Sequence, residues 1–197
     1  PEGDTDVTTL PEGEKPKMRT YSISALRHEQ QQFDIDFVHH EVGEIGGFAS
    51  RWSESASVGD VICSTSTPGM VKSIEPSCDW CFLVADMTAL PALTAQLAKL
   101  PESAKGYAVI EVRHADDVQN IVKPAGVEIF WQVASELQMS SLVERVTSLT
   151  WLAGEASVWC ASEFSQMRAL RDYFRNTRTV NKDNLYISSY WRSGCTE

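Results

Sequence analysis

A cation, an aromatic ring and a hydroxyl group occur together in the segment Arg19-Thr20-Tyr21-Ser22. Side chains in an extended strand alternate between its two faces, so Arg19 and Tyr21 share one face and Ser22 lies on the other. An aromatic ring beside hydrogen-bonding groups can stack on a planar cofactor such as a flavin and orient it. An exposed strand without a ligand has the same composition, and these residues alone leave both interpretations open.

Two glycines precede a short predicted helix in the segment Gly46-Gly47-Phe48-Ala49-Ser50-Arg51-Trp52. Backbone N–H groups at such a junction can bind a phosphate. An ordinary turn followed by a helix cap gives the same pattern, so this segment by itself does not decide between the two.

Other residues that often carry chemistry favour structural roles here. Cys78 and Cys81 form a Cys-x-x-Cys pair that precedes a predicted strand, whereas a redox pair follows a strand at the N-terminus of a helix. A zinc site needs two further closely spaced ligands, which the sequence lacks. His39 and His40 face opposite sides of a strand, so we expect no shared metal, although one of them is placed to contact a ligand. We therefore expect no catalytic side chain and no metal site.

Composition excludes several classes of protein. Acidic residues outnumber basic ones 27 to 17, for a net charge of −10, which argues against nucleic-acid binding. No apolar run approaches the roughly 20 residues that span a bilayer. Five cysteines in 197 residues fit a reduced, intracellular chain better than a disulfide scaffold. We expect a cytoplasmic protein that binds neither nucleic acid nor membrane, and a monomer because heptad repeats are lacking.

The hydrophobic pattern changes near residue 78, and we predict one domain over 1–77 and another over 78–197. The first part alternates with period two at 19–24 and 33–40, has a short helix at 48–56, a strand at 60–63 and a turn at Pro68-Gly69. These elements predict part of an antiparallel β-unit. Its strands are too few to close a barrel, so we expect the preceding part of the barrel to be missing from this sequence.

The second part predicts a parallel α/β sheet. Buried strands are expected at 80–85, 107–112, 127–133, 156–161 and 185–191. Helices are expected between them at 88–100, 136–150 and 163–178, with only a short helix in 113–126. Strands that alternate with helices favour a parallel sheet covered on both faces. Ligands of such sheets bind at the carboxyl ends of the strands.

Read together, these segments resemble the siderophore-interacting protein family, the ferric-siderophore reductases within the ferredoxin–NADP reductase superfamily. Seven motifs occur in the family's order and spacing over nearly the whole chain. The motifs are Arg19-Thr-Tyr-Ser, Asp36-Phe-Val-His-His40, Gly47-Phe-Ala-Ser-Arg-Trp52, Val84-Ala-Asp-Met-Thr-Ala-Leu-Pro91, Ile110-Glu-Val112, Val158-Trp-Cys-Ala-Ser-Glu163 with Met167-Arg168, and Tyr190-Trp-Arg-Ser-Gly194. The resemblance implies an FAD-binding β-barrel followed by an α/β domain that receives electrons.

The resemblance also implies a set of cofactor-binding residues. Arg19, Tyr21 and Ser22 would hold the phosphates and the flavin ring, and residues near the second strand would line the FAD site. The first helix would cradle the pyrophosphate, and residues at the domain junction would approach the flavin. The positions beyond Ser22 are Asp36, Phe37, Val38 and His40 for the FAD site, Gly47, Ala49, Ser50 and Trp52 for the pyrophosphate, and Asp86, Thr88 and Ala89 for the junction.

The implied activity is reduction of Fe(III) in a siderophore to Fe(II), with release of iron inside the cell. A flavin can accept two electrons and pass them on singly, and the hard oxygen ligands of siderophores hold Fe(II) less tightly than Fe(III). Ferric siderophores are often anionic, so local cations must act against the net charge of −10. We predict that Lys72 and Arg192 supply them, while solvated surface charge is the alternative for each.

The predicted electron-donor site departs from the family pattern at three places. Ala85-Asp-Met-Thr88 replaces Gly-Asp-Glu-Thr, and Ala161-Ser162-Glu163 replaces Ala-Gly-Glu. Both changes add a side chain where glycine would let a dinucleotide approach the backbone. The Trp-x-x-Arg pattern also lacks its arginine after Trp131. We hypothesise that NADPH or NADH binds weakly and that a reduced ferredoxin donates instead.

Two other function classes stay open from the sequence. One is a module that binds ferric siderophores without reducing them, and the presence of Arg19, Tyr21 and Ser22 argues against it. The other is a different flavin-dependent reductase of the same fold, and the segment that begins at Tyr190 argues against that through resemblance.

Overall fold

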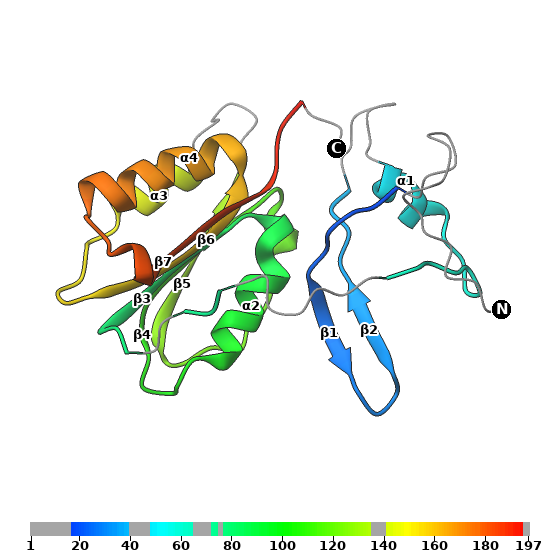
Figure 1. The fold of residues 1–197 in the computed structure, drawn as a ribbon, viewed down its shortest axis with the longest axis horizontal. Helices are drawn as coiled ribbons and strands as arrows, with labels where there is room; N and C mark the ends of the chain where they lie inside the picture. The colour runs from blue at the N-terminus through cyan, green and yellow to red at the C-terminus, as the bar shows by residue number, and fades with distance from the viewer. Residues whose placement is uncertain (1–16, 40–47, 65–71, 75–76, 135–140, 195–197) are drawn as a thin grey trace.

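The computed structural model describes residues 17–39, 48–64, 72–74, 77–134 and 141–194. Figure 1 shows two units side by side, one around a two-stranded hairpin and one around a five-stranded sheet. We call the described residues of 17–64 the hairpin unit and those of 77–194 the sheet unit. The predicted combination of an antiparallel sheet with a parallel α/β sheet is confirmed.

The sheet unit is built on five parallel strands. They are β3 (Trp80–Ala85), β4 (Lys105–Val112), β5 (Gly126–Val133), β6 (Ala156–Glu163) and β7 (Leu185–Trp191). Their order in the sheet is β5-β4-β3-β6-β7. The chain therefore builds outward from β3 to β5 and then returns to place β6 on the other side of β3. The carboxyl ends of β3 and β6 form the topological switch point, where ligands of open α/β sheets bind.

Helices cover both faces of this sheet (Figure 1). On one face α2 (Leu90–Lys99) packs Leu93 against Leu83 of β3. On the other face α3 (Ser141–Ser148) and α4 (Phe164–Asp172) pack against Phe82. Every residue of β3 and of β6 is buried. Because both faces are covered, these strands appear in the sequence as continuous apolar runs without alternation.

The predicted strands of the sheet unit begin and end within two residues of the observed ones. The predicted helices are continued or preceded by other helical turns: η3 (Met87–Ala89) precedes α2, and the π-helical turn η5 (Tyr173–Thr177) continues α4. The link between β4 and β5 holds the short helix η4 (Ala115–Asp117), as expected, and η6 (Lys182–Asn184) precedes β7. The first part of the predicted helix 136–150 lies outside the described residues, which resume at 141.

The strand predictions for the first part of the chain were less accurate. The hairpin consists of β1 (Ile23–Arg27) and β2 (Gln32–Ile35), not of strands over 19–24 and 33–40. The two strands extend only as far as their residues pair with each other. Residues 17–22 precede β1 and form no regular strand. The predicted strand at 60–63 is wrong, because no described strand pairs with it and Val61 is 89% exposed. The predicted turn at Pro68-Gly69 lies outside the described residues.

The hairpin unit has no buried core among its described residues. Its helix α1 (Phe48–Ser55) buries no side chain, and apolar residues such as Leu26 and Phe33 of the hairpin are 52% and 42% exposed. The hairpin and α1 therefore form a shallow layer rather than a closed unit. Among the described residues, no helix has the length and apolarity to cross a bilayer.

The two units touch through α2, which lies beside β1, and through polar contacts. The Arg113 guanidinium donates a hydrogen bond to the carbonyl of His39 over 3.5 Å.

Ile74 lies in the core of the sheet unit, and its N–H donates to the side chain of Gln96. The boundary between residues 77 and 78 stays a prediction, although Ile74 shows that packing of the sheet unit starts before it.

Candidate functional site

Three aromatic side chains from separate segments meet in the hairpin unit. The ring centroids of Tyr21 and Phe37 are 4.8 Å apart, and those of Phe37 and Trp52 are 6.0 Å apart. Tyr21 precedes β1, Phe37 follows β2 and Trp52 belongs to α1. We call these three residues the aromatic row. It brings together rings that the sequence assigned to one cofactor site.

Arg19 lies close enough to the aromatic row to act on Tyr21. Burial raises the pKa of the Tyr21 phenol, and the positive charge of Arg19 opposes that shift. The side chain of Arg19 is exposed, and it donates a hydrogen bond to the carbonyl of Met18 over 2.7 Å. A guanidinium beside an aromatic ring suits a ligand that combines a planar group with phosphates.

The start of α1 supplies the other part of the predicted phosphate site. Ala49 and Ser50 belong to its first turn, where backbone N–H groups lack helical partners. Gly47 and His40, which the sequence assigned to the same site, lie outside the described residues. Asp36 is exposed and Val38 is half-buried in the segment after β2.

The chemistry of this donor set fits FAD. Tyr21 is 39% exposed and Phe48 is 43% exposed, so aromatic surface is open to solvent beside a cation and a helix start. A planar ring placed against such surface removes apolar area from water, and a pyrophosphate would meet Arg19 and the N–H groups of α1. Aromatic rings, a guanidinium and the backbone N–H groups of a helix start together suit a flavin dinucleotide.

The sheet unit contributes a carboxylate at the switch point. Asp86, directly after β3, is 6% exposed. Its Oδ1 accepts hydrogen bonds from the backbone N–H (2.9 Å) and the hydroxyl (2.6 Å) of Thr88, and its Oδ2 accepts one from Trp191 Nε1 (2.7 Å). Burial raises the pKa of Asp86, and these hydrogen bonds only partly oppose the rise. Both oxygens of this carboxyl group therefore accept hydrogen bonds from within the chain.

A second carboxylate ends the neighbouring strand. Glu163, the last residue of β6, caps α4: its Oε2 accepts from the N–H of Ser165 (2.5 Å) and of Gln166 (3.4 Å) and from the Ser165 hydroxyl. Its Oε1 accepts from the N–H of Ser193 over 3.1 Å. Burial alone would raise the pKa of Glu163, but these hydrogen bonds outweigh burial and lower it.

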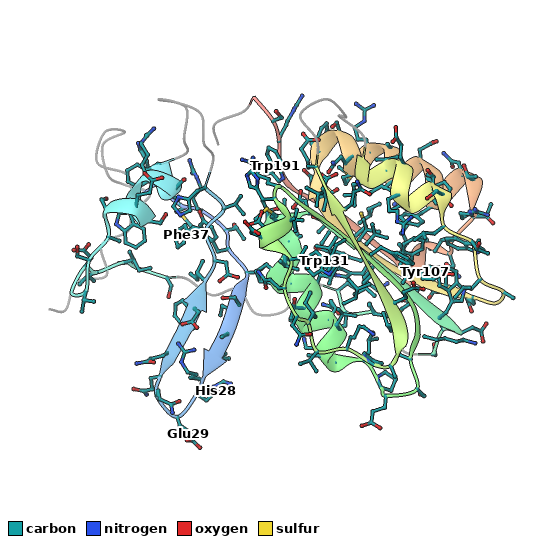
Figure 2. All side chains as sticks on the ribbon, turned by 180° about the vertical axis from the view of Figure 1, so that it is seen from behind. His28, Glu29, Phe37, Tyr107, Trp131 and Trp191 are labelled. Atoms are coloured by element: carbon teal, nitrogen blue, oxygen red, sulfur yellow. The ribbon has the colours of Figure 1, made fainter. Side chains whose placement is uncertain are left out.

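The last residue of β7 and the two residues after it connect both carboxylates. We call Trp191–Ser193 the strap. Figure 2 shows Trp191 on the side of the sheet unit nearest the hairpin unit, which carries Phe37. Between the two anchored residues, the Arg192 guanidinium lies 4.7 Å from the ring centroid of Phe164. The Arg168 guanidinium lies 5.9 Å from the same ring, on the rim of an open hollow of about 660 Å³.

Ser22 turns away from the aromatic row and toward the sheet unit. Its hydroxyl is hydrogen-bonded to the phenol of Tyr190, which also bonds to Tyr186. Burial raises the pKa of Tyr190 to about 12. The alternation expected from the sequence is thus observed, since Tyr21 packs on Phe37 while Ser22 contacts the neighbouring unit.

The two predicted substrate cations are not brought together. The Lys72 ammonium donates a hydrogen bond to the carbonyl of Asp183, just before β7 begins, whereas Arg192 follows the end of β7. The whole length of that strand separates them, at opposite edges of the sheet. Of the pair, Arg192 is the one that lies on the side of the switch point.

The residues of the predicted electron-donor site have buried side chains. Ala161 and Ser162 are fully buried in β6, and the Glu163 carboxylate is bonded within the chain as described above. Ala89 is likewise fully buried.

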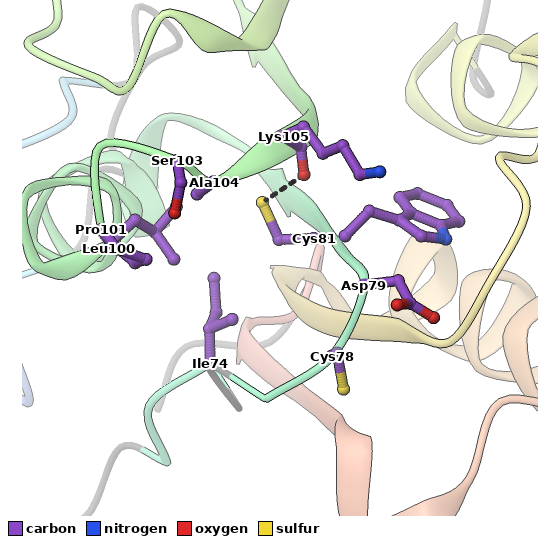
Figure 3. Close-up of a pocket in the computed structure, with 10 residues that line it drawn as sticks. Ile74, Cys78, Asp79, Cys81, Leu100, Pro101, Ser103, Ala104 and Lys105 are labelled. Carbon is purple, nitrogen blue, oxygen red and sulfur yellow. Dashed lines mark hydrogen bonds between the residues drawn. The ribbon is translucent and has the colours of Figure 1, made fainter.

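The Cys-x-x-Cys pair lies at the opposite, amino-terminal edge of the sheet. Figure 3 shows the sulfur atoms of Cys78 and Cys81 pointing in opposite directions beside a cavity of about 190 Å³. The Cys81 thiol donates to the carbonyl of Lys105 over 3.5 Å, and burial raises its pKa to about 11. The two cysteines form no disulfide with each other. Together with the strand that follows, this geometry fits structural residues rather than a redox pair.

Within the described residues, no cluster of three or more histidine, cysteine or carboxylate side chains forms a metal site. The sequence interpretation gave roles to Asp86, Glu163 and Arg192 but not to the residues that join them, Phe164, Trp191 and Ser193. The segment Tyr190-Trp-Arg-Ser-Gly194 carried the signal, because its motif includes Trp191 and Ser193 beside Arg192.

Comparisons with known proteins agree with this geometry. A family model described as "Siderophore-interacting FAD-binding domain" matches residues 1–70, and one described as "Siderophore-interacting protein" matches residues 78–194. The ferric vibriobactin reductase ViuB of Vibrio cholerae is 31% identical over 186 residues, 93% of this chain and 67% of that protein. The ferric acinetobactin reductase of Acinetobacter baumannii is 28% identical over 191 residues, 95% of this chain and 65% of that protein.

A solved structure agrees over most of the chain. The siderophore-interacting protein SipS from Aeromonas hydrophila has a TM-score of 0.78 and 34% identity, and the match covers 93% of this chain and 76% of that one. The arrangement of a small antiparallel unit beside a parallel sheet is therefore shared with that protein.

Proposed function

Because this chain belongs to the siderophore-interacting protein family, we propose that it is an FAD-dependent reductase that converts Fe(III) in a siderophore to Fe(II). The observation that carries the proposal is the aromatic row beside Arg19 and the start of α1. This site lies in the part of the chain that the FAD-binding domain model matches. Two relatives whose names describe ferric-siderophore reductases support the reaction.

The hairpin unit would hold the cofactor. Tyr21, Phe37 and Trp52 offer the aromatic surface for the planar ring, and Arg19 with the first turn of α1 offers donors for the phosphates. Bound FAD would supply the redox chemistry that side chains lack, since a flavin accepts two electrons together and passes them on singly. We propose the same role for the rest of the predicted set: Ser22, Asp36, Val38, His40, Gly47, Ala49, Ser50, Asp86, Thr88 and Ala89. Of these, Asp86 and Ser22 would act through their contacts at the junction.

Cationic side chains of the sheet unit would bind the substrate. Each Fe(III) takes up one electron, so a two-electron donor serves two ferric chelates, and the hard oxygen ligands then hold Fe(II) less tightly. The net charge of −10 repels an anionic chelate, and Arg192 with Arg168 beside Phe164 provides local positive charge against it. Neither arginine forms an ion pair with another described residue. Lys72, at the other edge of the sheet, would serve a chelate only at a separate site.

We propose a reduced ferredoxin as the electron donor in preference to NADPH or NADH. Ala85 and Ser162, both fully buried, stand where the family pattern has glycines that would open the backbone to a dinucleotide. The Glu163 carboxylate also occupies the first-turn N–H groups of α4, which are the groups that bind a dinucleotide phosphate in many α/β sheets.

An anaerobic absorption titration tests the reductase and its donor together. The flavin-loaded protein receives NADPH, NADH or reduced ferredoxin, then a ferric siderophore. We expect reduced ferredoxin to bleach the oxidised-flavin band as about two equivalents are added, one electron from each. NADPH and NADH should bleach the band slowly, and the chelate should restore it. Efficient bleaching by NADPH would contradict the donor proposal alone.

A protein that binds the ferric siderophore but never restores the flavin band would be a non-reducing binding module. Tyr21→Ala provides a matched check of the cofactor site, with Tyr173→Ala on α4's continuation as the control. We expect Tyr21→Ala to weaken FAD binding by about tenfold, the loss of roughly one aromatic contact, and the control to leave it unchanged. Equal FAD affinity in the two variants would show that the aromatic row is not part of the FAD site.

A further inference from the structure

The residues on both sides of Arg192 are anchored to carboxylates from the ends of two central strands. Trp191 donates its indole N–H to Asp86 Oδ2 over 2.7 Å, and Ser193 donates its backbone N–H to Glu163 Oε1 over 3.1 Å. The backbone carbonyl of Trp191 also accepts from the Ser189 hydroxyl over 2.9 Å. The strap is thereby fixed across the switch point while Arg192 itself stays exposed.

Both anchoring carboxylates are rigid. Asp86 is 6% exposed and its other oxygen is bonded to Thr88, so the group has little freedom to turn toward a ligand. Glu163 is 8% exposed and its other oxygen caps α4. The guanidinium of Arg192 rests over Phe164, the first residue of that same helix. A side chain held in one place loses less conformational entropy when it binds, so its contribution to affinity is larger.

We propose that Asp86 is a positioning residue for Arg192: it acts through Trp191 and holds the guanidinium where an anionic ferric chelate reaches it. Glu163 has the same function on the other side, through Ser193. The inference rests on the proposed function, in which Arg192 contacts the chelate. Asp86 itself contacts neither the chelate nor the iron, because both of its oxygens are used inside the chain.

Trp191→Phe is the sharpest variant, since it removes the indole N–H and keeps an aromatic ring at the position. Binding is measured by calorimetry with gallium(III) complexes, which do not accept electrons. One probe is an anionic gallium(III) tricatecholate, and the other is a gallium(III) trihydroxamate whose ligand carries a pendant ammonium group that makes the complex cationic. We expect the dissociation constant of the anionic complex to rise about fivefold, the size of one partly exposed ion pair, and that of the cationic complex to stay unchanged.

A double-mutant cycle tests whether the effect passes through Arg192. Arg192→Gln should weaken binding of the anionic complex, and adding Trp191→Phe to it should weaken binding no further, because the anchored cation is already gone. Asp86→Asn should reproduce Trp191→Phe where it folds. Arg175→Gln removes an exposed cation from η5 and Asp79→Asn removes a loop-holding carboxylate at the opposite edge of the sheet. Both controls should leave the two dissociation constants as in the wild type.

The outcomes separate this inference from the proposed function. If Arg192→Gln weakens anionic binding and Trp191→Phe does not, positioning by Asp86 is overturned and the role of Arg192 stands. If Trp191→Phe weakens binding of both complexes equally, the tryptophan acts by packing and the inference is again overturned. If Arg192→Gln binds the anionic complex like the wild type, the assigned role of Arg192 is wrong and the inference fails with it.

Discussion

Strands β3 and β6 of the sheet unit are buried over their full length, whereas no described residue of the hairpin unit is buried. The difference extends to the candidate site. Asp86 and Glu163 are fixed by hydrogen bonds inside the chain, while Tyr21, Phe37 and Trp52 form a row of ring contacts and keep exposed surface. The sheet unit therefore positions its groups before a ligand arrives, and the hairpin unit offers surface that a cofactor would complete.

Matched glycine substitutions should show the largest difference between the units. Gly106 has φ +141°, and a Cβ there would lie 1.9 Å from the carbonyl oxygen of Cys81 in the adjacent strand. Gly59 has φ +105° and open space around it. We expect Gly106→Ala to lower the free energy of unfolding by about 4 kcal/mol, from strain and overpacking together, and Gly59→Ala by about 1 kcal/mol, from strain alone. Urea unfolding followed by circular dichroism measures both, and similar losses would contradict the contrast in packing.

FAD binding should stabilise the hairpin unit more than the sheet unit. At a hundredfold excess over its dissociation constant, a ligand adds about 2.7 kcal/mol to the state that binds it. We expect hydrogen exchange in 17–39 and 48–64 to slow by up to about a hundredfold with FAD, because local opening there breaks the site. Exchange in β3 and β6 should change little. Equal protection of both units would show that the cofactor is not held mainly by the aromatic row.

The acid dependence of stability should differ between two carboxylates whose pKa values are both lowered. The pKa of Glu163 is lowered by internal hydrogen bonds that outweigh its burial, and that of Asp34 by its exposed hydrogen-bonded pair with Arg27. A lowered pKa in the folded state gives stability that is present above the unfolded pKa and lost as pH falls through the folded one. We expect Glu163→Gln to flatten the acid limb of the stability curve and Asp34→Asn to leave it nearly unchanged, since exposed pairs contribute little.

The pKa of Asp86 is raised, so this residue should change the pH dependence of stability in the opposite direction. Its raised pKa favours the protonated form in the folded state, so its contribution is present below the unfolded pKa and lost as pH rises through the folded pKa. Relative to the wild type, Asp86→Asn should therefore become more stable as pH rises from acidic to neutral. Parallel curves for the wild type and Asp86→Asn would mean that the group does not titrate differently on folding.

The predictions from sequence succeeded where the local pattern was sufficient. The apolar run at 80–85 became β3 with the expected bounds, and the run at 156–161 lies within β6, because a strand buried on both faces is marked by its own composition. The strand expected at 60–63 failed, because a short apolar segment forms a strand only when a neighbouring strand pairs with it. The bounds of the hairpin strands failed for the same reason, since pairing with the other strand sets them.

The sequence by itself determined the family, the doubly covered sheet and the residues of the aromatic row, since motif order and residue type carry that information. Only the tertiary structure decided which residues meet. Lys72 and Arg192 looked like a pair of cations, but the length of β7 separates them. Asp86 and Trp191 are 105 positions apart and form a hydrogen bond. They come together because β6 lies beside β3 in the sheet and β7, which ends at Trp191, lies beside β6. Sequence separation does not report such contacts, which depend on the order of strands in the sheet.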